Sequence, residues 1–303
     1  MTIQQFNVGS GDLVAVVTST TINLNLSTLF GDNYSRPQNK TVVIEAGVTI
    51  GSNSIGSAAL IVPSGGQGLI KIINKGSIQG AGGAAGTSGD GGTGGDAVLL
   101  QVPTLVINEA GAVIYGGGGG GGRGGTGGNG GNGSYDTLLG PSMCNVWPTN
   151  QAGGNSACAA RYGSGAFCAS GSPTTAGCSS GFRRCQDCRR TNSSTGGAGG
   201  AGGAGGRGRG YDGALASGSA GSAGAAGGTN AGTGGTGGTG GTGGDWGSSG
   251  NTGNTGATGS NGNVSNGLAG AGGSAGGLAG YYINGFSAYA TFINNGTAAG
   301  RTN

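Results

Sequence analysis

Glycine recurs at every third position from Gly232 to Gly262, eleven times in succession and without an intervening proline. A three-residue period in an extended chain is the period of a polyproline II helix. The glycines of such a helix lie along one edge, where the missing Cβ lets a second backbone approach within hydrogen-bonding distance. Collagen would need about 15–20% proline, yet all six prolines lie at or before Pro173. The register therefore predicts polyproline II helices hydrogen-bonded side by side.

Composition restricts the rest of the architecture. Glycine makes up 83 of the 303 residues, and only 8% of residues are charged. Such a composition without a period is typical of disorder, which is the alternative to an ordered bundle. We expect almost no α-helix, because no apolar stripe has the helical period. The chain has no apolar run of about 18 residues, so no membrane insertion is expected, and its start predicts no secretory signal.

A short unit recurs four times, first at Val43 and last at Phe292. Each copy is an apolar segment, a polar-glycine turn and a second short segment that ends in glycine. Units that cannot bury their apolar face alone are expected to stack. The spacings of 29 and 34 residues between Ile44, Ile73 and Ile107 suit the coils of a β-helix or small β-prism. The alternative is an ordinary β-sandwich of hairpins.

The predicted fold class is therefore all-β/irregular. It has an N-terminal β-strand base, β-helix or β-prism-like, followed by a glycine-rich polyproline II helix bundle. Residues 13–26 are predicted to form a strand, because Ile22, Leu24 and Leu26 alternate with asparagines.

Seven successive glycines, Gly116–Gly122, place glycine on every edge of an extended segment. Such a segment can be surrounded, so we expect it at the centre of the bundle; a flexible linker is the alternative. The Gly-Gly-X segments 196–206 and 232–244 are expected at the periphery, with Ala or Thr facing outward. The expected regions are 1–64 for attachment, 65–131 for β repeats with the first polyproline II helices, 132–195 for a cysteine-rich insert, and 196–303 for the bundle with a C-terminal β repeat.

The six cysteines all fall in the insert: Cys144, Cys158, Cys168, Cys178, Cys185 and Cys188. The even count in a segment with almost no apolar core predicts disulfides, with fifteen possible connectivities. The alternative is zinc, because Cys185 and Cys188 have the spacing of a zinc knuckle. That motif stands alone, and the chain has no histidine, so we expect no metal.

Aromatic and arginine residues gather in the same insert and are common anchors of interfaces. Its positive balance favours an acidic partner. The alternative is that these side chains form the insert's own small core, which we favour for Phe167 and Phe182. Two aromatics outside the insert either cap a bundle end or contact a ligand. The candidate receptor-binding residues are Tyr135, Trp147, Tyr162, Arg183, Arg184, Arg189, Arg190, Tyr211 and Trp246.

Enzyme chemistry finds little support in the sequence. The absence of histidine excludes His-dependent triads and facial metal triads. The frequent Gly-X-Gly-X-X-Gly strings follow from glycine abundance and open no predicted helix. We therefore expect no catalytic residue and no cofactor. Arg207 and Arg209 are too few to predict nucleic-acid binding.

Residues Ala112–Gly122 run from a β segment into the glycine run, and Thr-Gly-Gly arrays broken by variable segments follow. In the composition and order of these segments, over roughly residues 65–303, the chain resembles the glycine-rich adhesins at the tips of long tail fibres of T-even-like bacteriophages. It is also similar to the C-terminal tips of some siphophage host-specificity proteins. The six-cysteine insert departs from the family's pattern.

The resemblance implies a sandwich of polyproline II helices at the distal tail or tail-fibre tip of a virion. Its loops would bind a bacterial outer-membrane protein or lipopolysaccharide, and its N-terminal region a phage tail or fibre protein. A monomer on a trimeric fibre and a homotrimer both stay open. The alternative is a passive structural or ice-binding extracellular protein, which the outward threonines would suit: Thr233, Thr236, Thr239 and Thr242.

Overall fold

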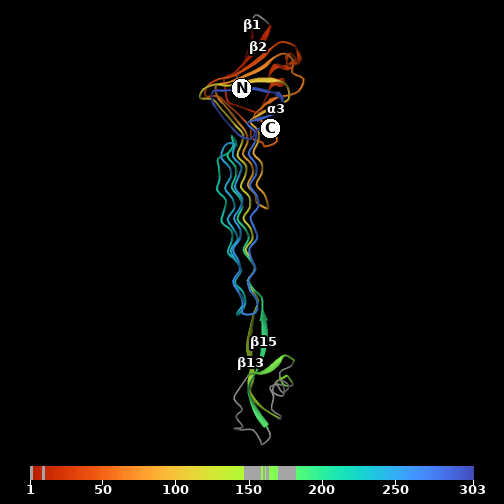
Figure 1. Cartoon of the computed structure of the whole chain (residues 1–303), viewed down its shortest axis with the longest axis vertical. Helices are drawn as coiled ribbons and strands as arrows, with labels where there is room; N and C mark the ends of the chain where they lie inside the picture. Colours follow the sequence, from red (N-terminus) through yellow and green to blue (C-terminus); the bar gives the residue numbers. More distant parts are fainter. Residues whose placement is uncertain (1–2, 9–10, 147–157, 160, 162–163, 170–181) are drawn as a thin grey trace.

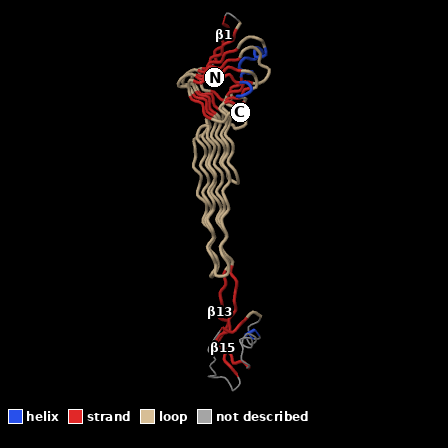
Figure 2. Tube along the Cα trace, in the orientation of Figure 1, coloured by secondary structure: helices blue, strands red, loops and turns tan. Residues whose placement is uncertain are grey.

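The structure is a computed structural model that describes all residues except 1–2, 9–10, 147–157, 160, 162–163 and 170–181. Figure 1 shows a long molecule with a β base that carries both marked chain ends. A bundle of extended segments runs from the base, and a hairpin projects from the far end of the bundle. Figure 2 shows that strands lie at the two ends of the molecule and that the bundle between them is irregular by secondary structure.

The base is a three-sided prism in which the chain visits three sheets in turn. All of its strand pairs are parallel except β1 with β2. Sheet A has the order β1 (Ile3–Val8), β2 (Asp12–Val17), β5 (Lys40–Ile44), β8 (Ile70–Asn74), β11 (Thr104–Asn108) and β17 (Ala290–Asn294). Sheet B has β3 (Thr21–Ile22), β6 (Thr49–Gly51), β9 (Ser77–Gln79), β12 (Val113–Tyr115) and β18 (Thr297–Ala299). Sheet C has β4 (Leu24–Asn25), β7 (Leu60–Val62), β10 (Val98–Leu100) and β16 (Ile283–Asn284).

Helices are short, as expected. Those with bounds in the described part of the chain are α1 (Leu26–Phe30), a 3-10 turn η1 (Gly31–Ser35) and α3 (Phe286–Tyr289). Among the described residues, no helix has the length and apolar character needed to cross a membrane.

The core of the prism consists of inward-facing aliphatic residues that stack from coil to coil. Val42, Ile72 and Val106 occupy one register position of sheet A and are fully buried. At the end of the same strands, the side-chain amide of Asn74 donates to Asn108 Oδ1 at 2.8 Å, and Asn108 donates to Asn294 Oδ1 at 2.8 Å. This amide ladder satisfies polar groups that would otherwise be costly to bury.

The recurring unit is confirmed as one coil of the prism, but its predicted alignment was wrong by one residue in the first copy. Ile73 pairs with Ile107 as expected, whereas its partner on the other side is Val43 and Ile44 pairs with Asn74. The reason is the turn that follows β5, which is longer than the turn that follows β8. The longer turn compensates for the different register of β5 and β8, so that the next two strands, β6 and β9, still pair.

The prediction of one strand over residues 13–26 was also wrong. Asn23 has a φ of 50° and turns the chain between β3 and β4, so this segment forms a complete coil by itself. Leu24 and Leu26 are buried, but Ile22 is 45% exposed, because Thr21 pairs with the buried Ile50 and Ile22 therefore faces outward. Asparagine is one of the few residues that adopt the left-handed region readily.

The bundle leaves the prism at the corner between sheets B and C. In the first coil this corner is Asn23 alone, and in the second it is residues 52–59. The third coil extends the corner to residues 80–97 and the fourth to residues 116–282. The bundle is therefore an expansion of one repeated corner.

The segment 116–131 lies at the centre of the bundle, as the glycine run predicted. The amides of Gly118, Gly121 and Gly124 donate to the carbonyls of Arg209, Gly206 and Gly203. The donors and the acceptors both advance in steps of three residues, which is the period of the glycine pattern. Backbone hydrogen bonds join the central segment to residues 80–86, 91–95, 196–210, 232–244, 249–262 and 266–281.

Most glycines of the outer segments lie where the segment meets a neighbour. A Cβ on Gly196 would lie 1.8 Å from the carbonyl oxygen of Gly130, and one on Gly197 would lie 1.9 Å from that of Ala225. Ala198 and Thr233 are exposed at the third position. The predicted outward placement of alanine and threonine is confirmed.

Candidate functional site

The part of the molecule farthest from the base is an antiparallel sheet of β13 (Gly133–Val146), β14 (Ala166–Ala169) and β15 (Phe182–Ser194). β13 and β15 form a hairpin that continues directly from the bundle. Its register shifts between Leu138 and Gly140, and β14 adds to the far edge of β15. The bundle therefore presents the cysteine-rich insert at the end opposite to the chain termini.

The root of the hairpin is fastened to two turns of the bundle. Ser134 donates its amide to Asn263 Oδ1 at 2.8 Å, and its carbonyl accepts from Asn263 Nδ2 at 2.9 Å. The same carbonyl accepts from Asn230 Nδ2 at 2.9 Å, and Asn230 has a φ of 60°. Two asparagine side chains thus hold the backbone of one hairpin residue, which fixes how the hairpin leaves the bundle.

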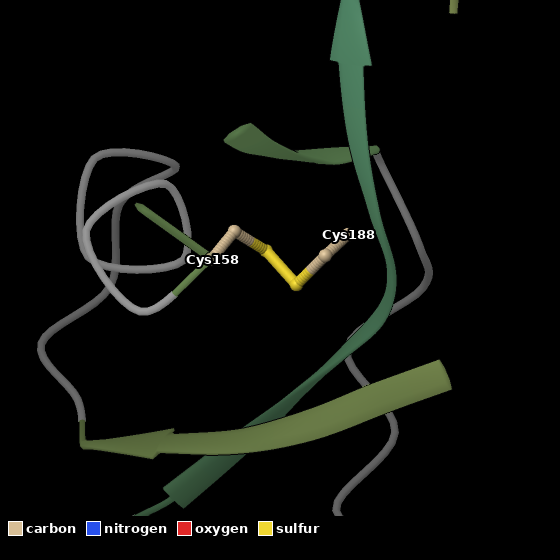
Figure 3. Close-up of a disulfide and its surroundings, with 2 residues drawn as sticks. All are labelled: Cys158 and Cys188. Atoms are coloured by element: carbon tan, nitrogen blue, oxygen red, sulfur yellow. A yellow bond between two sulfur atoms is a disulfide. The ribbon is translucent and has the colours of Figure 1, made fainter. Parts of the chain in front are cut away.

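A disulfide joins Cys158 to Cys188 on β15, as Figure 3 shows. Both cysteines are fully buried. This pair confirms that the insert holds a disulfide, and it removes one thiolate from the proposed Cys185–Cys188 zinc motif. Cys144, Cys168 and Cys185 lie on the strands with only their backbone described, and Cys178 lies outside the described residues.

Three candidate receptor-binding side chains are described on the hairpin, and all are half-buried: Tyr135, Arg189 and Arg190. Tyr135 pairs with Asn192 across the hairpin, and Arg189 pairs with Leu138 on one side and Phe167 on the other. Arg183 and Arg184 lie farther along β15, with the backbone alone described. Trp147 and Tyr162 lie outside the described residues.

The other two candidates, Tyr211 and Trp246, lie at the opposite end of the bundle, against the prism. The ring of Tyr211 covers Gly51, where a Cβ would lie 2.2 Å from the ring. Trp246 stacks on Tyr115 of β12 with 5.6 Å between ring centroids. The structure therefore does not bring these aromatics together with the residues of the insert.

Charged groups accompany the aromatics at that junction. The guanidinium of Arg209 lies 5.5 Å from the centroid of the Trp246 ring and 3.1 Å from Asp245 Oδ1. The amide of Trp246 donates to Asp245, and this hydrogen bond, with Arg209 beside it, holds the pKa of Asp245 below its usual range. Arg207 pairs with Asp212 near Tyr211. These charged contacts lie within the bundle, beside the aromatic contacts with the prism.

Two surfaces were not predicted from the sequence. One is an outward row of aliphatic side chains across sheet A, in continuous register: Val16, Val43, Ile73, Ile107 and Ile293. The alternation within each repeat could have revealed it. The other is a cavity at the hairpin root, which joins segments far apart in sequence. Among the described residues, no group of three or more His, Cys, Asp or Glu could hold a metal ion.

The comparison with protein families identifies the chain. A model of the family described as phage tail fibre adhesin Gp38 matches residues 12–183. The match covers more than half of the chain, from the first coil of the prism through the central segment and into the insert. The chain belongs to this family of bacteriophage tail fibre adhesins.

Among solved structures, the chain is similar to the crystal structure of the gp37-gp38 adhesin tip complex of the bacteriophage S16 long tail fiber. That similarity has a TM-score of 0.41 and 18% sequence identity, and it covers 96% of this chain and 82% of that chain. No curated protein matches.

Proposed function

We propose that this tail fibre adhesin binds its bacterial receptor with the hairpin and insert at the far end of the bundle. The observation that carries the proposal is the separation of the two ends. The central segment 116–131 spans on the order of 50 Å at the polyproline II rise. Loops held on a rigid scaffold are common sites of recognition, and the hairpin root is fastened to that scaffold by Asn230 and Asn263.

The proposed receptor is an outer-membrane protein or lipopolysaccharide. The insert contains five arginines and two aspartates, so it favours an acidic surface. Within the insert, the proposed contact residues are Tyr135, Trp147, Tyr162, Arg183, Arg184, Arg189 and Arg190. Tyr211 and Trp246, which pack at the prism, are not included.

The test is removal of residues 144–188, which joins Met143 to Arg189. Leu138 pairs with Arg189, so a five-residue loop would close the shortened hairpin. The hydrogen bonds of Asn230 and Asn263 to the hairpin root would be kept. We expect an unchanged thermal midpoint for the bundle and loss of binding to host cells. Unchanged binding to cells would place the receptor site elsewhere.

We further propose that the prism attaches the adhesin to its fibre. Sheet A lies opposite the corner from which the bundle leaves, and its outward aliphatic row faces away from the adhesin tip. Parallel sheets are usually covered on both faces, so an apolar end of a fibre protein is a suitable partner. This surface includes strands from residues 1–64 and from the later coils, and it allows one monomer or a homotrimer to sit at the fibre end.

Ile107→Glu would place a charge within this row, and Ile61→Glu on the outer face of sheet C is the matched control. We expect I107E to lose binding to the distal fragment of the fibre protein of the same phage and I61E to keep it. Equal binding by both variants would exclude sheet A as the docking face.

The proposed location is the distal tail-fibre tip of the virion, at the host surface during adsorption. We propose no catalytic activity and no cofactor, because the family is one of adhesins. Family membership also favours adhesion over the passive or ice-binding alternative. Three of the four outward threonines that would suit ice binding already form side-chain hydrogen bonds within the protein: Thr233 with Ser260, Thr239 with Asn254 and Thr242 with Asn251.

A further inference from the structure

The hairpin root encloses a cavity of about 670 Å³ that opens to solvent. Strands β13 and β15 form one wall, and two turns of the bundle form the other. Its side chains are hydroxyls and amides without a formal charge, together with Val264, which is 61% exposed. The lining residues are Asn132, Gly133, Ser134, Thr191, Asn192, Ser193, Ser194, Thr195, Gly228 and Val264.

We propose that this cavity is a binding site for a neutral sugar unit of a bacterial surface polysaccharide. A sugar hydroxyl both donates and accepts, so it pairs well with serine, threonine and asparagine side chains. A phosphate or carboxylate would be better held by arginine or lysine, and neither lines the cavity. The volume lies within the usual range for small-ligand sites of about 300–1,000 Å³.

Several polar groups of the cavity remain available to a ligand. In the described part of the chain, Ser193 Oγ and Thr195 Oγ1 have no protein hydrogen-bond partner. Asn132 uses its Oδ1 to accept from the amide of Gly196 at 3.3 Å, which leaves its Nδ2 as a donor. Thr191, by contrast, is occupied by Asp136. The free groups therefore include hydroxyls that can donate or accept and an amide donor.

The walls of the cavity are held before any ligand binds. Asn263 and Asn230 fix Ser134 on one side. On the other side Gly228 packs closely, since a Cβ there would lie 2.9 Å from Ser194 Cβ. A preformed site loses less ordering entropy on binding. Tyr135 follows Ser134 of the lining in sequence and pairs with Asn192 in the hairpin.

This inference rests on the proposed function, because it places the sugar next to the receptor-binding insert. It also refines that proposal, since the insert favours acidic groups and the cavity favours neutral ones. A surface glycan that carries both could contact both regions. The sugar could come from lipopolysaccharide or from a capsule, whose neutral hexoses share the same chemistry.

The test is titration of the nitrogen-15-labelled full chain with methyl glucoside and methyl galactoside, followed by amide NMR. Glucuronic acid and inorganic phosphate are the charged comparators. We expect saturable shifts at Ser193, Thr195 and Val264, with millimolar affinity, for at least one neutral glycoside. No saturable shift at these amides with either glycoside, or equal shifts with phosphate, would overturn the proposal.

Variants separate binding from misfolding. Thr195→Val removes one free hydroxyl while keeping the shape, and Thr236→Val makes the same change on the outer face of the bundle. We expect T195V to weaken glycoside binding by about threefold to tenfold, the effect of one hydrogen bond, and T236V to leave it unchanged. Equal affinities for the two variants would contradict the assignment.

Binding to whole cells and to purified glycans distinguishes this inference from the proposed function. Cell binding without glycoside binding would overturn the sugar site and leave the adhesin proposal standing. Loss of both would overturn both. Competition by purified lipopolysaccharide alone, or by capsular polysaccharide alone, would identify the source of the sugar.

Discussion

At the scale of single residues, the presence or absence of a Cβ decides whether the bundle can close. Glycines in the central segment face neighbouring carbonyls at distances that no side chain can occupy. A Cβ on Gly121 would lie 2.0 Å from the carbonyl oxygen of Gly241, whereas one on Gly272 would meet nothing within 4 Å. The local sequence does not distinguish these two glycines, but their surroundings in the fold are very different.

Gly121→Ala and Gly272→Ala therefore form a matched pair. We expect G121A to destabilise the protein by about 3 kcal/mol or more, because two rigid backbones must separate. G272A should be neutral or stabilising by up to about 1 kcal/mol, since it restricts only the unfolded chain. Thermal denaturation measures both. Equal midpoints for the two variants would contradict the close packing of the central segment.

Tyr34 gives a pH dependence at the same scale. Its hydroxyl is buried and donates to the carbonyl of Pro63 at 2.5 Å, and burial raises the pKa of Tyr34 to about 12. Above pH 10 the unfolded chain loses this proton while the folded protein keeps it. The free energy of unfolding should therefore fall by about 2 kcal/mol between pH 10 and 12 from this group.

Chemical denaturation across this pH range measures the effect of Tyr34. The difference between the wild type and Tyr34→Phe isolates the group, because Tyr282, whose pKa is also raised by burial, contributes equally to both. A difference that stays constant with pH would show that Tyr34 titrates normally.

At the scale of elements, a buried lysine donates hydrogen bonds to three loop carbonyls at the edge of the prism. Lys40 is fully buried at the start of β5, and its Nζ donates to the carbonyls of Arg36, Gln38 and Gln67 at 2.7 Å each. Burial lowers the pKa of Lys40. One side chain thus closes two loops that precede neighbouring strands of sheet A.

Lys40→Met should destabilise the prism by about 3 kcal/mol, because it leaves three carbonyls without their donor. Lys71→Met, on the outward face of β8, is the control and should change stability by less than about 0.5 kcal/mol. Urea denaturation compares the two. Similar losses for both variants would show that the carbonyl contacts contribute little.

At the scale of the whole molecule, the central segment is surrounded by the other segments of the bundle. Residues 116–131 have hydrogen-bonded neighbours on all sides, whereas residues 214–227 bond only to two outer segments, 196–210 and 232–244. Amide hydrogen exchange should therefore be slowest in the central segment and faster in residues 214–227. Uniformly fast exchange across the bundle would mean that the segments do not pair.

Local patterns were enough to predict the kind of architecture. The three-residue glycine period predicted extended segments paired through their backbones, and the run Gly116–Gly122 predicted the centre of the bundle. The repeated apolar units predicted stacked coils, and the cysteine count predicted a disulfide. The glycine and apolar patterns were informative because the spacing of residues along an extended chain determines which side of the chain each residue faces.

Placement in space depended on contacts between segments far apart in the chain. From the sequence, Tyr211 and Trp246 could either cap a bundle end or contact a ligand, and only the structure shows that they pack on the prism at Gly51 and Tyr115. It aligned Ile44 with Ile73, although a longer turn shifts that register. A glycine edge accepts any backbone that presents a carbonyl, so periodicity leaves the choice of neighbours open. That choice is made where the bundle leaves one corner of the prism, because this corner sets which segments start side by side.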